Sequence, residues 1–204
     1  MKVLKAIPAL TADDVVRGQF RGYRLERGVA ADSKVETFVA LRLQIDSWRW
    51  QGVPFYIRAG KSLPVTCTEV VARLRRPPTV FHDFRLEPNY FRFRISPEIT
   101  VAIGANVIAD GQETSSRTAE MLGTQLPRAD EMDAYERVLG DAMQGDPTLF
   151  AREDYVEEAW RIVDPLLTDI SPVHEYEPGT WGPEEVDSIV SPPGGWQNPT
   201  LKVP

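Results

Sequence analysis

The sequence lacks the features that mark secreted, membrane-spanning and nucleic-acid-binding proteins. Its single cysteine, Cys67, excludes an internal disulfide and suits a reducing compartment. No apolar run is long enough to cross a bilayer, and the beginning of the chain does not resemble a signal peptide. The 23 Lys and Arg residues face 30 Asp and Glu residues, and the resulting net charge of -7 opposes binding to a phosphate backbone. We expect a cytoplasmic protein that binds neither membrane nor nucleic acid.

Motifs for nucleotide and metal binding are also missing. The chain has no G-x-G-x-x-G fingerprint for a dinucleotide. Gly60-Lys61-Ser62 imitates the end of a phosphate-binding P-loop, but Phe55 stands where that loop needs its first glycine. His82 and His174 have no partner at metal-ligand spacing. The sequence therefore predicts neither a nucleotide cradle nor a metal site.

The first half of the chain has the periodicity of β-strands. Apolar and polar residues alternate over residues 36–45, which predicts a strand with one buried face. Further strands are expected at residues 53–59, 69–74, 90–95 and 100–108, and the short connections between them favour antiparallel pairing. Because Arg92 and Arg94 alternate with phenylalanines, we expect solvent or a ligand to face these arginines.

The second half has helical spacing. One apolar stripe extends from residue 132 to 143, behind the N-cap candidate Asp130 and before Gly145, which suits a C′ position. A second stripe covers residues 156–167, where Pro165 is late enough to kink or tighten the last turn. The proline-rich remainder predicts a single short helix, at residues 183–190.

Strands followed by helices predict an α+β fold, with one large, mostly antiparallel sheet and amphipathic helices packed on one face. We predict one domain over residues 1–204. Its core extends from about residue 14 to 190, and a Pro- and Gly-rich tail covers residues 191–204.

Lys61 is the clearest candidate for binding a ligand. A lysine beside a glycine at the end of a strand can hold a single phosphate as a point charge. An ordinary solvated turn lysine has the same sequence signature. Arg58, three residues earlier, has the same two interpretations, an anion contact or an ion pair at a sheet edge. From the residues alone, both alternatives stay open.

Several segments, in this linear order, resemble the C-terminal domain of glucose-6-phosphate dehydrogenases. The most specific are Gly52-Val53-Pro54-Phe55-Tyr56-Ile57-Arg58-Ala59-Gly60-Lys61-Ser62 and Asp133-Ala134-Tyr135-Glu136-Arg137. The others are residues 16–20, 36–40, 158–162 and 181–183. The resemblance extends from about Val3 to Trp196.

The resemblance implies part of an enzyme of the oxidative pentose phosphate pathway, which passes hydride from C1 of glucose 6-phosphate to NADP. In the family an N-terminal Rossmann domain binds NADP and a His–Asp pair acts as the base. Neither is expected in this chain, so it is predicted to lack catalytic residues and to need the Rossmann domain in cis or in trans. It would supply substrate binding and a homodimer through its sheet. The alternative is a stand-alone, non-catalytic oligomerisation or sugar-phosphate-binding module.

The resemblance also assigns substrate-binding residues. Lys61 matches a lysine that contacts the sugar phosphate, and Arg58 and Arg94 match positions that often face bound anions. Ser96 stands where some members carry a substrate-binding glutamine, so this contact is expected to be weakened or replaced.

A second, structural NADP is bound on this domain in animal members by Lys, Arg and Tyr residues. The matching positions here include Cys67, Val71, Ala102 and Gly104, none of which pairs with phosphate or stacks on adenine. Only Asp133, Arg58 and Arg94 remain of such a site. The resemblance therefore predicts no structural NADP and no metal.

Overall fold

The computed structural model describes residues 1–78, 86–108, 116–125, 133–167 and 171–200. The chain forms two compact units. The first comprises Met1–Pro64 with Ala134–Asn198, and the second comprises Val65–Asp133 with Pro199–Pro204. The prediction that both belong to one domain stays a prediction.

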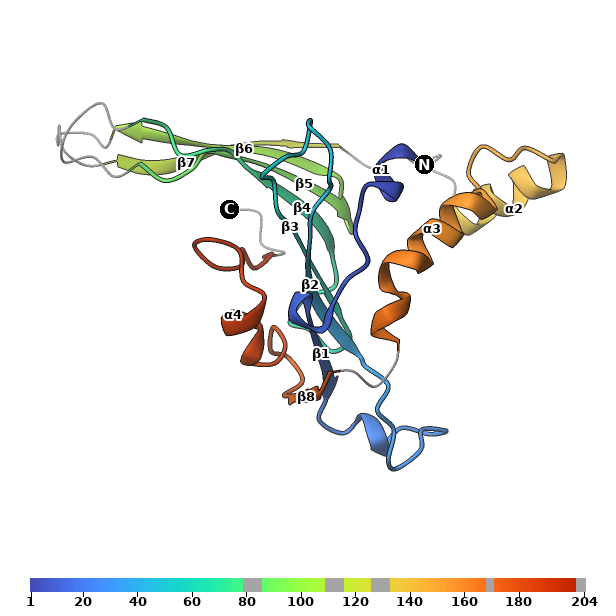
Figure 1. Cartoon of the computed structure of the whole chain (residues 1–204). Helices are drawn as coiled ribbons and strands as arrows, with labels where there is room; N and C mark the ends of the chain where they lie inside the picture. The colour runs from blue at the N-terminus through green and yellow to red at the C-terminus, as the bar shows by residue number, and fades with distance from the viewer. Residues whose placement is uncertain (79–85, 109–115, 126–132, 168–170, 201–204) are drawn as a thin grey trace. The chain divides into compact units, whose positions relative to one another are not determined.

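The first unit contains all of the helices that the structure describes (Figure 1). Its elements are α1 (Lys2–Lys5), β1 (Val15–Phe20), β2 (Phe38–Leu43), β3 (Phe55–Gly60), α2 (Ala134–Gln144), α3 (Glu153–Val163), β8 (Val173–Tyr176) and α4 (Glu185–Ile189). Short 3-10 turns occur at Ala12–Asp14, Tyr23–Leu25 and Asp164–Leu166. The second unit contains β4 (Thr68–Arg73), β5 (Tyr90–Ser96), β6 (Thr100–Ile108) and β7 (Ser116–Thr124).

The strands confirm the α+β class and the mostly antiparallel pairing. They are divided between two four-stranded sheets, with the orders β3-β2-β1-β8 and β4-β5-β6-β7. All pairs are antiparallel except β1 with β8, which is parallel. The five predicted strands correspond to β2 to β6, while β1, β7 and β8 were not expected.

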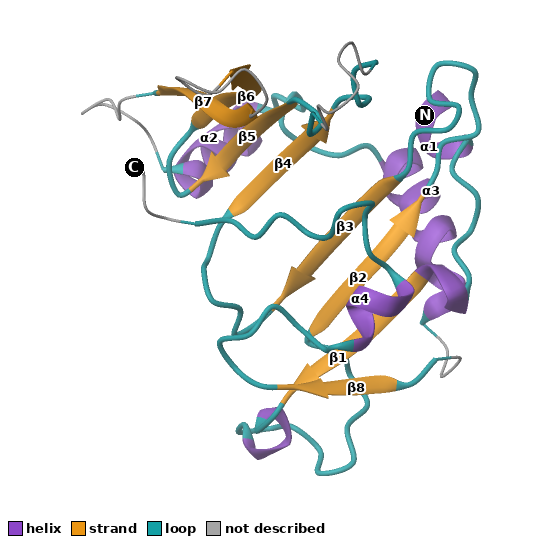
Figure 2. Cartoon of the chain, turned by 90° about the vertical axis from the view of Figure 1, so that its left-hand side faces the viewer, coloured by secondary structure: helices purple, strands orange, loops and turns teal. Residues whose placement is uncertain are grey.

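The sheet of the first unit is covered on both faces. Val15 lies in a cluster with Ile162 of α3 and the 3-10 residue Leu166. Its neighbour Val16 points to the opposite face and packs with Val186 of α4 and with Val190. In Figure 2, α4 accordingly lies in front of this sheet and α3 behind it. β1 is therefore buried along nearly its whole length.

The predicted helices form close to their expected bounds. Gly145 has a φ of 72° directly after α2, as expected for a C′ glycine. Pro165 lies in the 3-10 turn that follows α3, so it tightens the end of this helix. The N-cap candidate Asp130 lies outside the described residues. α3 buries Ile162 against the sheet, whereas no residue of α2 is buried.

The sheet of the second unit has two dissimilar faces. One face carries Glu69, Arg92, Arg94 and Glu120 on adjacent strands. The other face carries apolar side chains that remain exposed: Val70 (52%), Phe93 (41%), Ile95 (58%), Val101 (43%), Ile103 (37%) and Met121 (67%). Arg94 is thus the only buried residue of β5, and Phe93 and Ile95 are exposed, which inverts the expected exposure.

Candidate functional site

Lys61 lies in a turn at the end of β3 whose backbone is held by hydrogen bonds. Its backbone N–H donates to the carbonyl of Thr37 over 2.8 Å. The next residue, Ser62, has a φ of 52°, and its carbonyl accepts the N–H of Gly179 over 2.7 Å. Gly60 is required because an added Cβ would lie 2.7 Å from the ring of Phe38. The turn is thereby held by Thr37, the residue before β2, and by the segment that follows β8.

The side chain of Lys61 is available to bind an anion. Lys61 is exposed, and no described carboxylate pairs with its ammonium group. Its carbonyl accepts a 2.7 Å hydrogen bond from the buried hydroxyl of Tyr176. A fixed backbone thus presents an unpaired positive charge, which fits the interpretation as an anion contact.

Arg58 lies on β3, three residues before Lys61. Its guanidinium carbon is 4.6 Å from the ring centroid of Trp181 and 4.7 Å from that of Trp196. Its Nη2 donates to Oδ1 of Asn198 over 2.7 Å. Cation–π attraction on two sides fixes this guanidinium. Arg58 and Lys61 therefore place two positive charges at the same end of β3.

Arg94 and Ser96 belong to β5, in the second unit. Arg94 is only 6% exposed, and its Nε and Nη2 donate to Oε2 of Glu69 over 3.0 and 2.8 Å. Nη2 also donates to the carbonyl of Thr200 over 2.7 Å. The expectation that solvent faces Arg94 is wrong for this chain, because a buried carboxylate faces it. That Arg94 contacts a ligand stays a prediction. Ser96 is exposed at the end of β5.

Arg92 continues this row of charges. It pairs with Glu120 over 2.5 Å and with Glu69 over 3.4 Å, so carboxylates face this arginine too. The hydrogen bond from Arg92, reinforced by one from Tyr90, holds the pKa of Glu120 below its usual range in spite of partial burial. Burial and the neighbouring Glu120 raise the pKa of Tyr90. The polar face is thus an internally neutralised network of ion pairs.

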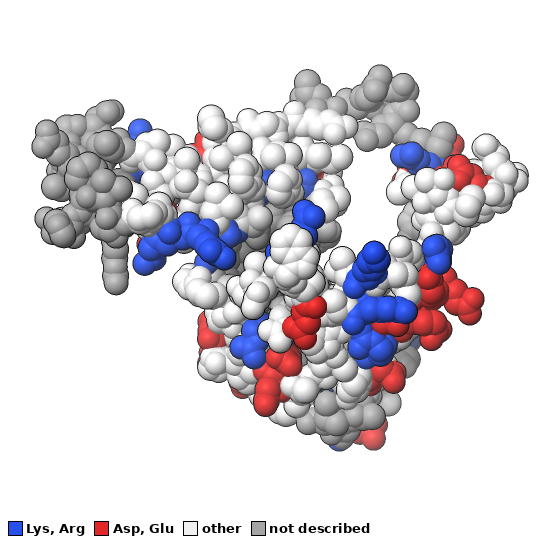
Figure 3. Space-filling view, turned by 45° about the horizontal axis from the view of Figure 1, so that its top comes forward, with Lys and Arg blue, Asp and Glu red and all other residues white. Residues whose placement is uncertain are grey.

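Over part of the face seen in Figure 3, Lys and Arg side chains lie next to Asp and Glu side chains. Exposed ion pairs also join Arg152 to Asp154 and Arg161 to Glu158. Within the described ranges no group of three or more His, Cys, Asp or Glu side chains is arranged to hold a metal ion. The described helices include none with the length and apolar character of a membrane span.

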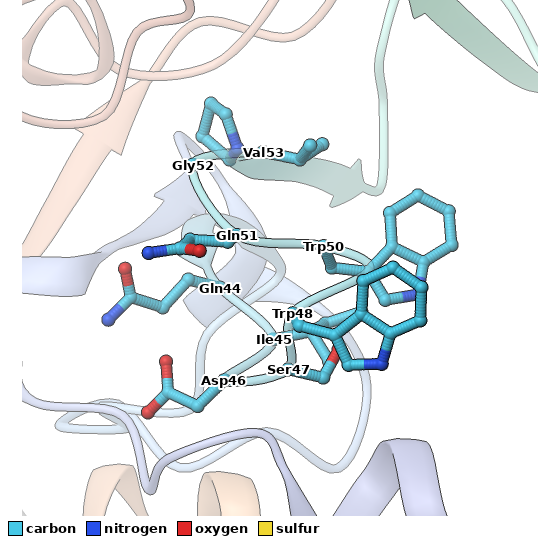
Figure 4. A pocket seen from close by; sticks show the side chains of 10 residues that line it. Gln44, Ile45, Asp46, Ser47, Trp48, Trp50, Gln51, Gly52 and Val53 are labelled. Carbon is cyan, nitrogen blue, oxygen red and sulfur yellow. The ribbon is translucent and has the colours of Figure 1, made fainter.

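A hollow of about 680 Å³ lies at the loop between β2 and β3. Figure 4 shows Trp48 and Trp50 on one side of this loop, and Gln44, Gln51 and Asp46 pointing away from them. Because its aromatic and polar side chains diverge, the hollow offers no converging set of ligand contacts. None of the predicted site residues lines it.

Sequence reasoning missed the residues that support the Lys61 turn. Thr37 contacts residue 61 from the position before β2, whereas Tyr176 and Gly179 contact residues 61 and 62 only after the chain returns from α3 through β8. Tyr176 stands in a proline-rich segment without a strand periodicity, so no local pattern marked it. The Gly-Lys pair itself was the only local signal for this site.

Comparison with known proteins gives one consistent result. The family model for the glucose-6-phosphate dehydrogenase C-terminal domain matches residues 1–197. Glucose-6-phosphate 1-dehydrogenase 1 of Mycobacterium tuberculosis (strain ATCC 25618 / H37Rv) is 42% identical over 203 residues, which cover 98% of this chain and 43% of that protein. The enzyme named glucose-6-phosphate 1-dehydrogenase in Aggregatibacter actinomycetemcomitans is 38% identical over 219 residues, covering 98% of this chain and 44% of that protein.

Solved structures agree with the sequence comparison. The crystal structure of glucose-6-phosphate 1-dehydrogenase from Mycobacterium avium superimposes with a TM-score of 0.88 at 41% identity, over 99% of this chain and 44% of that chain. A glucose-6-phosphate dehydrogenase in complex with its substrate glucose-6-phosphate gives a TM-score of 0.78 at 29% identity, over 93% of this chain and 42% of that chain. The chain spans less than half the length of these relatives. It belongs to the glucose-6-phosphate dehydrogenase C-terminal domain family.

Proposed function

We propose that this chain is the substrate-binding and dimerisation part of a cytoplasmic glucose-6-phosphate dehydrogenase. The whole enzyme would oxidise C1 of glucose 6-phosphate with NADP, giving 6-phosphogluconolactone and NADPH. The chain alone would not be catalytically complete. The observation that carries the proposal is the Lys61 turn, where an exposed ammonium group with no carboxylate partner among the described residues stands on a hydrogen-bonded backbone.

Lys61 suits the phosphate group of the substrate. A charged hydrogen bond to a phosphate is stronger than a neutral one, and a fixed backbone reduces the entropy lost on binding. Arg58 supports the same role because Trp181 and Trp196 hold its guanidinium at the same end of β3. Lys61 therefore acts as the direct phosphate contact, and Arg58 as a second, fixed positive charge.

Arg94 and Ser96 are weaker candidates for contacting the substrate. Glu69 neutralises the charge of Arg94, so an anion would have to compete with a buried carboxylate. Ser96 is exposed and offers one hydroxyl group in place of the longer glutamine side chain of some relatives. We assign both residues a smaller share of substrate binding than Lys61.

We propose that the described residues of this chain do not bind NADP. In the part of the chain that the structure describes, no helix begins at the Lys61 turn to offer its N-terminus to a pyrophosphate. The positions that match a structural NADP site are also occupied: Ala102 is 1% exposed, and an added Cβ at Gly104 would lie 2.2 Å from the ring of Tyr90. We therefore assign NADP to the remaining part of the enzyme.

The exposed apolar face of the second sheet supports a homodimer. Val70, Phe93 and Val101 stand side by side on β4, β5 and β6, and each is more than a third exposed. Contiguous exposed apolar side chains mark interaction surfaces in water-soluble proteins. Sedimentation of the chain should show concentration-dependent dimers. A monomer at all concentrations would contradict this part of the proposal.

The decisive experiment joins this chain to the N-terminal part of a relative, or mixes the two, and measures NADPH formation from glucose 6-phosphate. Activity is expected only when both parts are present. Lys61→Ala should raise the KM for glucose 6-phosphate about 10-fold or more and leave kcat within about twofold, since a charged contact to the bound substrate is lost.

Two further variants provide controls. Lys61→Arg keeps a positive charge and should recover part of the lost affinity. Lys5→Ala removes an exposed lysine from α1 and should leave the kinetics unchanged. An unchanged KM in Lys61→Ala would refute the site. Activity that never appears, together with sugar-phosphate binding by the chain alone, would instead favour the stand-alone module.

A further inference from the structure

Resting on this proposed function, we infer that Tyr176 is a positioning residue, whose hydroxyl fixes the Lys61 turn so that the lysine meets the sugar phosphate. The carbonyl of Lys61 accepts the hydroxyl of Tyr176 over 2.7 Å. Tyr176 is the last residue of β8, far from Lys61 in sequence. The end of β8, a strand distant in sequence, thus fixes the position of the Lys61 backbone.

The direction of the hydrogen bonds follows from counting protons. The phenol of Tyr176 has one proton, which the 2.7 Å bond to Lys61 uses. Oγ1 of Thr37 lies 3.3 Å from this phenol oxygen, so the threonine hydroxyl is the donor in that pair. Oγ1 in turn accepts the N–H of Phe20 over 3.0 Å. A chain of three hydrogen bonds therefore leads from the end of β1 to the Lys61 carbonyl, and each bond polarises the next.

The turn needs such support because its backbone is unfavourable. Ser62 has a φ of 52°, in the left-handed region that residues other than glycine seldom adopt. Residues in this region persist only where surrounding contacts hold them. The Gly179 N–H holds the Ser62 carbonyl, and Tyr176 holds the carbonyl one residue earlier. Without the Tyr176 hydroxyl, one of these two hydrogen bonds is lost, at the residue whose side chain contacts the phosphate.

The position of the tyrosine is itself well determined. Its side chain is buried, and its ring packs against Phe38 at a centroid distance of 5.4 Å. Burial raises the pKa of Tyr176, so its hydroxyl stays protonated and remains a donor throughout the neutral range. Since the ring contacts do not involve the hydroxyl, Tyr176→Phe should preserve the packing and remove only the hydrogen bonds.

The test compares Tyr176→Phe with Lys61→Ala in the two-part enzyme described above. Tyr176→Phe should raise the KM for glucose 6-phosphate about 3- to 10-fold with kcat within about twofold, because a neutral hydrogen bond that positions the contact is lost. In the 204-residue chain, hydrogen exchange at the Lys61 amide should accelerate by a similar factor. The amide donates to Thr37 within the same turn and reports on its opening.

Tyr56→Phe is the matched control, since it removes a hydroxyl from β3 that has no hydrogen-bond partner among the described residues. Thr37→Ser keeps the supporting hydroxyl and should behave as the unchanged chain, whereas Thr37→Val should reproduce part of the Tyr176→Phe effect. The threonine pair keeps the inference testable if Tyr176→Phe does not fold.

The outcomes separate this inference from the function on which it rests. A raised KM in Lys61→Ala with an unchanged KM in Tyr176→Phe overturns the positioning role and leaves the proposed function standing. An equal rise in Tyr56→Phe, or a loss of kcat alone, also overturns it, because either would indicate a general structural effect. If Lys61→Ala has no effect, the substrate site itself is refuted.

Discussion

The two units of the chain use their apolar residues in opposite ways. In the first unit, Val15 and Val16 are buried on opposite faces of the sheet, and Phe38 is 2% exposed between strands and loop. In the second unit, the side chains of Glu69 and Arg94 are 5% and 6% exposed, while Phe93 is 41% exposed. Both apolar core clusters belong to the first unit.

This difference separates folding from association. A sheet with both faces covered gains its stability from apolar burial within its own unit. A sheet that buries ion pairs and exposes apolar side chains obtains less from burial, and its remaining apolar surface is available to another protein surface. The first unit therefore holds the Lys61 turn through several hydrogen bonds, and the proposed role of the second unit is contact with a partner.

The largest expected effect is the contrast between Phe38→Ala and Phe93→Ala. Phe38 packs closely against Gly18, Gly60 and Gly182, so its loss should cost about 3–5 kcal/mol of the free energy of unfolding. Phe93→Ala should cost less than about 1 kcal/mol in the isolated chain, because its side chain is already partly hydrated.

Urea denaturation measures both variants. All five tryptophans lie in the first unit, so their fluorescence follows that unit, and hydrogen exchange follows β4 to β7. Equal destabilisation by the two variants would contradict the proposed difference in apolar burial between the two units. Phe93→Ala should instead weaken dimerisation, which sedimentation of the same samples measures.

A second, smaller effect is expected from the buried ion pair. Glu69→Ala leaves the Thr200 carbonyl as the remaining acceptor for Arg94 among the described residues. The variant should lose about 2–4 kcal/mol of the free energy of unfolding, because a buried charge loses its partner. Asp154→Ala, which breaks the exposed pair with Arg152, should cost less than about 1 kcal/mol. Hydrogen exchange of β4 and β5 measures the first change. If the double variant Glu69→Leu with Arg94→Met is as unstable as Glu69→Ala, an unpaired charge is not the cause.

The smallest effect concerns pH. The Arg92 hydrogen bond lowers the pKa of Glu120 in the folded chain, so the folded state binds this proton less tightly than the unfolded chain does. The contribution is therefore fully present above the ordinary glutamate pKa of 4.5 and is lost as the pH falls through the lower folded value. We expect less than about 1 kcal/mol, because the side chain is partly exposed.

Acid unfolding of Glu120→Gln checks this prediction. The free energy of unfolding of the variant should fall less steeply below pH 4.5 than that of the unchanged chain. Glu98→Gln, which alters an exposed glutamate of the same unit, should keep the original slope. Identical slopes for all three chains would show that Arg92 does not stabilise the Glu120 carboxylate.

Local patterns predicted the elements whose residues repeat regularly. Strand β2 shows in its alternating residues, and α3 in its apolar stripe, because each presents one face to a core. β1 was missed because it is buried on both faces and includes Arg17, Gly18 and Gln19, which hide its period. β8 has four residues, too few to show any period.

The sequence also predicted only part of the candidate site. Lys61 could be found because Gly60-Lys61 at the end of a strand is a local signal. Its support by Tyr176 could not be found, because that contact joins residues of distant segments. Arg94 was expected to face solvent or a ligand, since its alternation with phenylalanines does not reveal that Glu69 lies opposite on β4.

Local sequence patterns were sufficient to predict the α+β class, the regular strands and helices, the family resemblance and the Gly-Lys turn. Each of these depends on residues close together in the chain, whose spacing is set by backbone geometry. Three features became visible only in the folded chain: the ion pairs of the β5 arginines, the exposure of the apolar face of the second sheet, and the hydrogen bond from Tyr176 to Lys61. These features depend on strand register and on contacts between distant segments, which no local spacing contains.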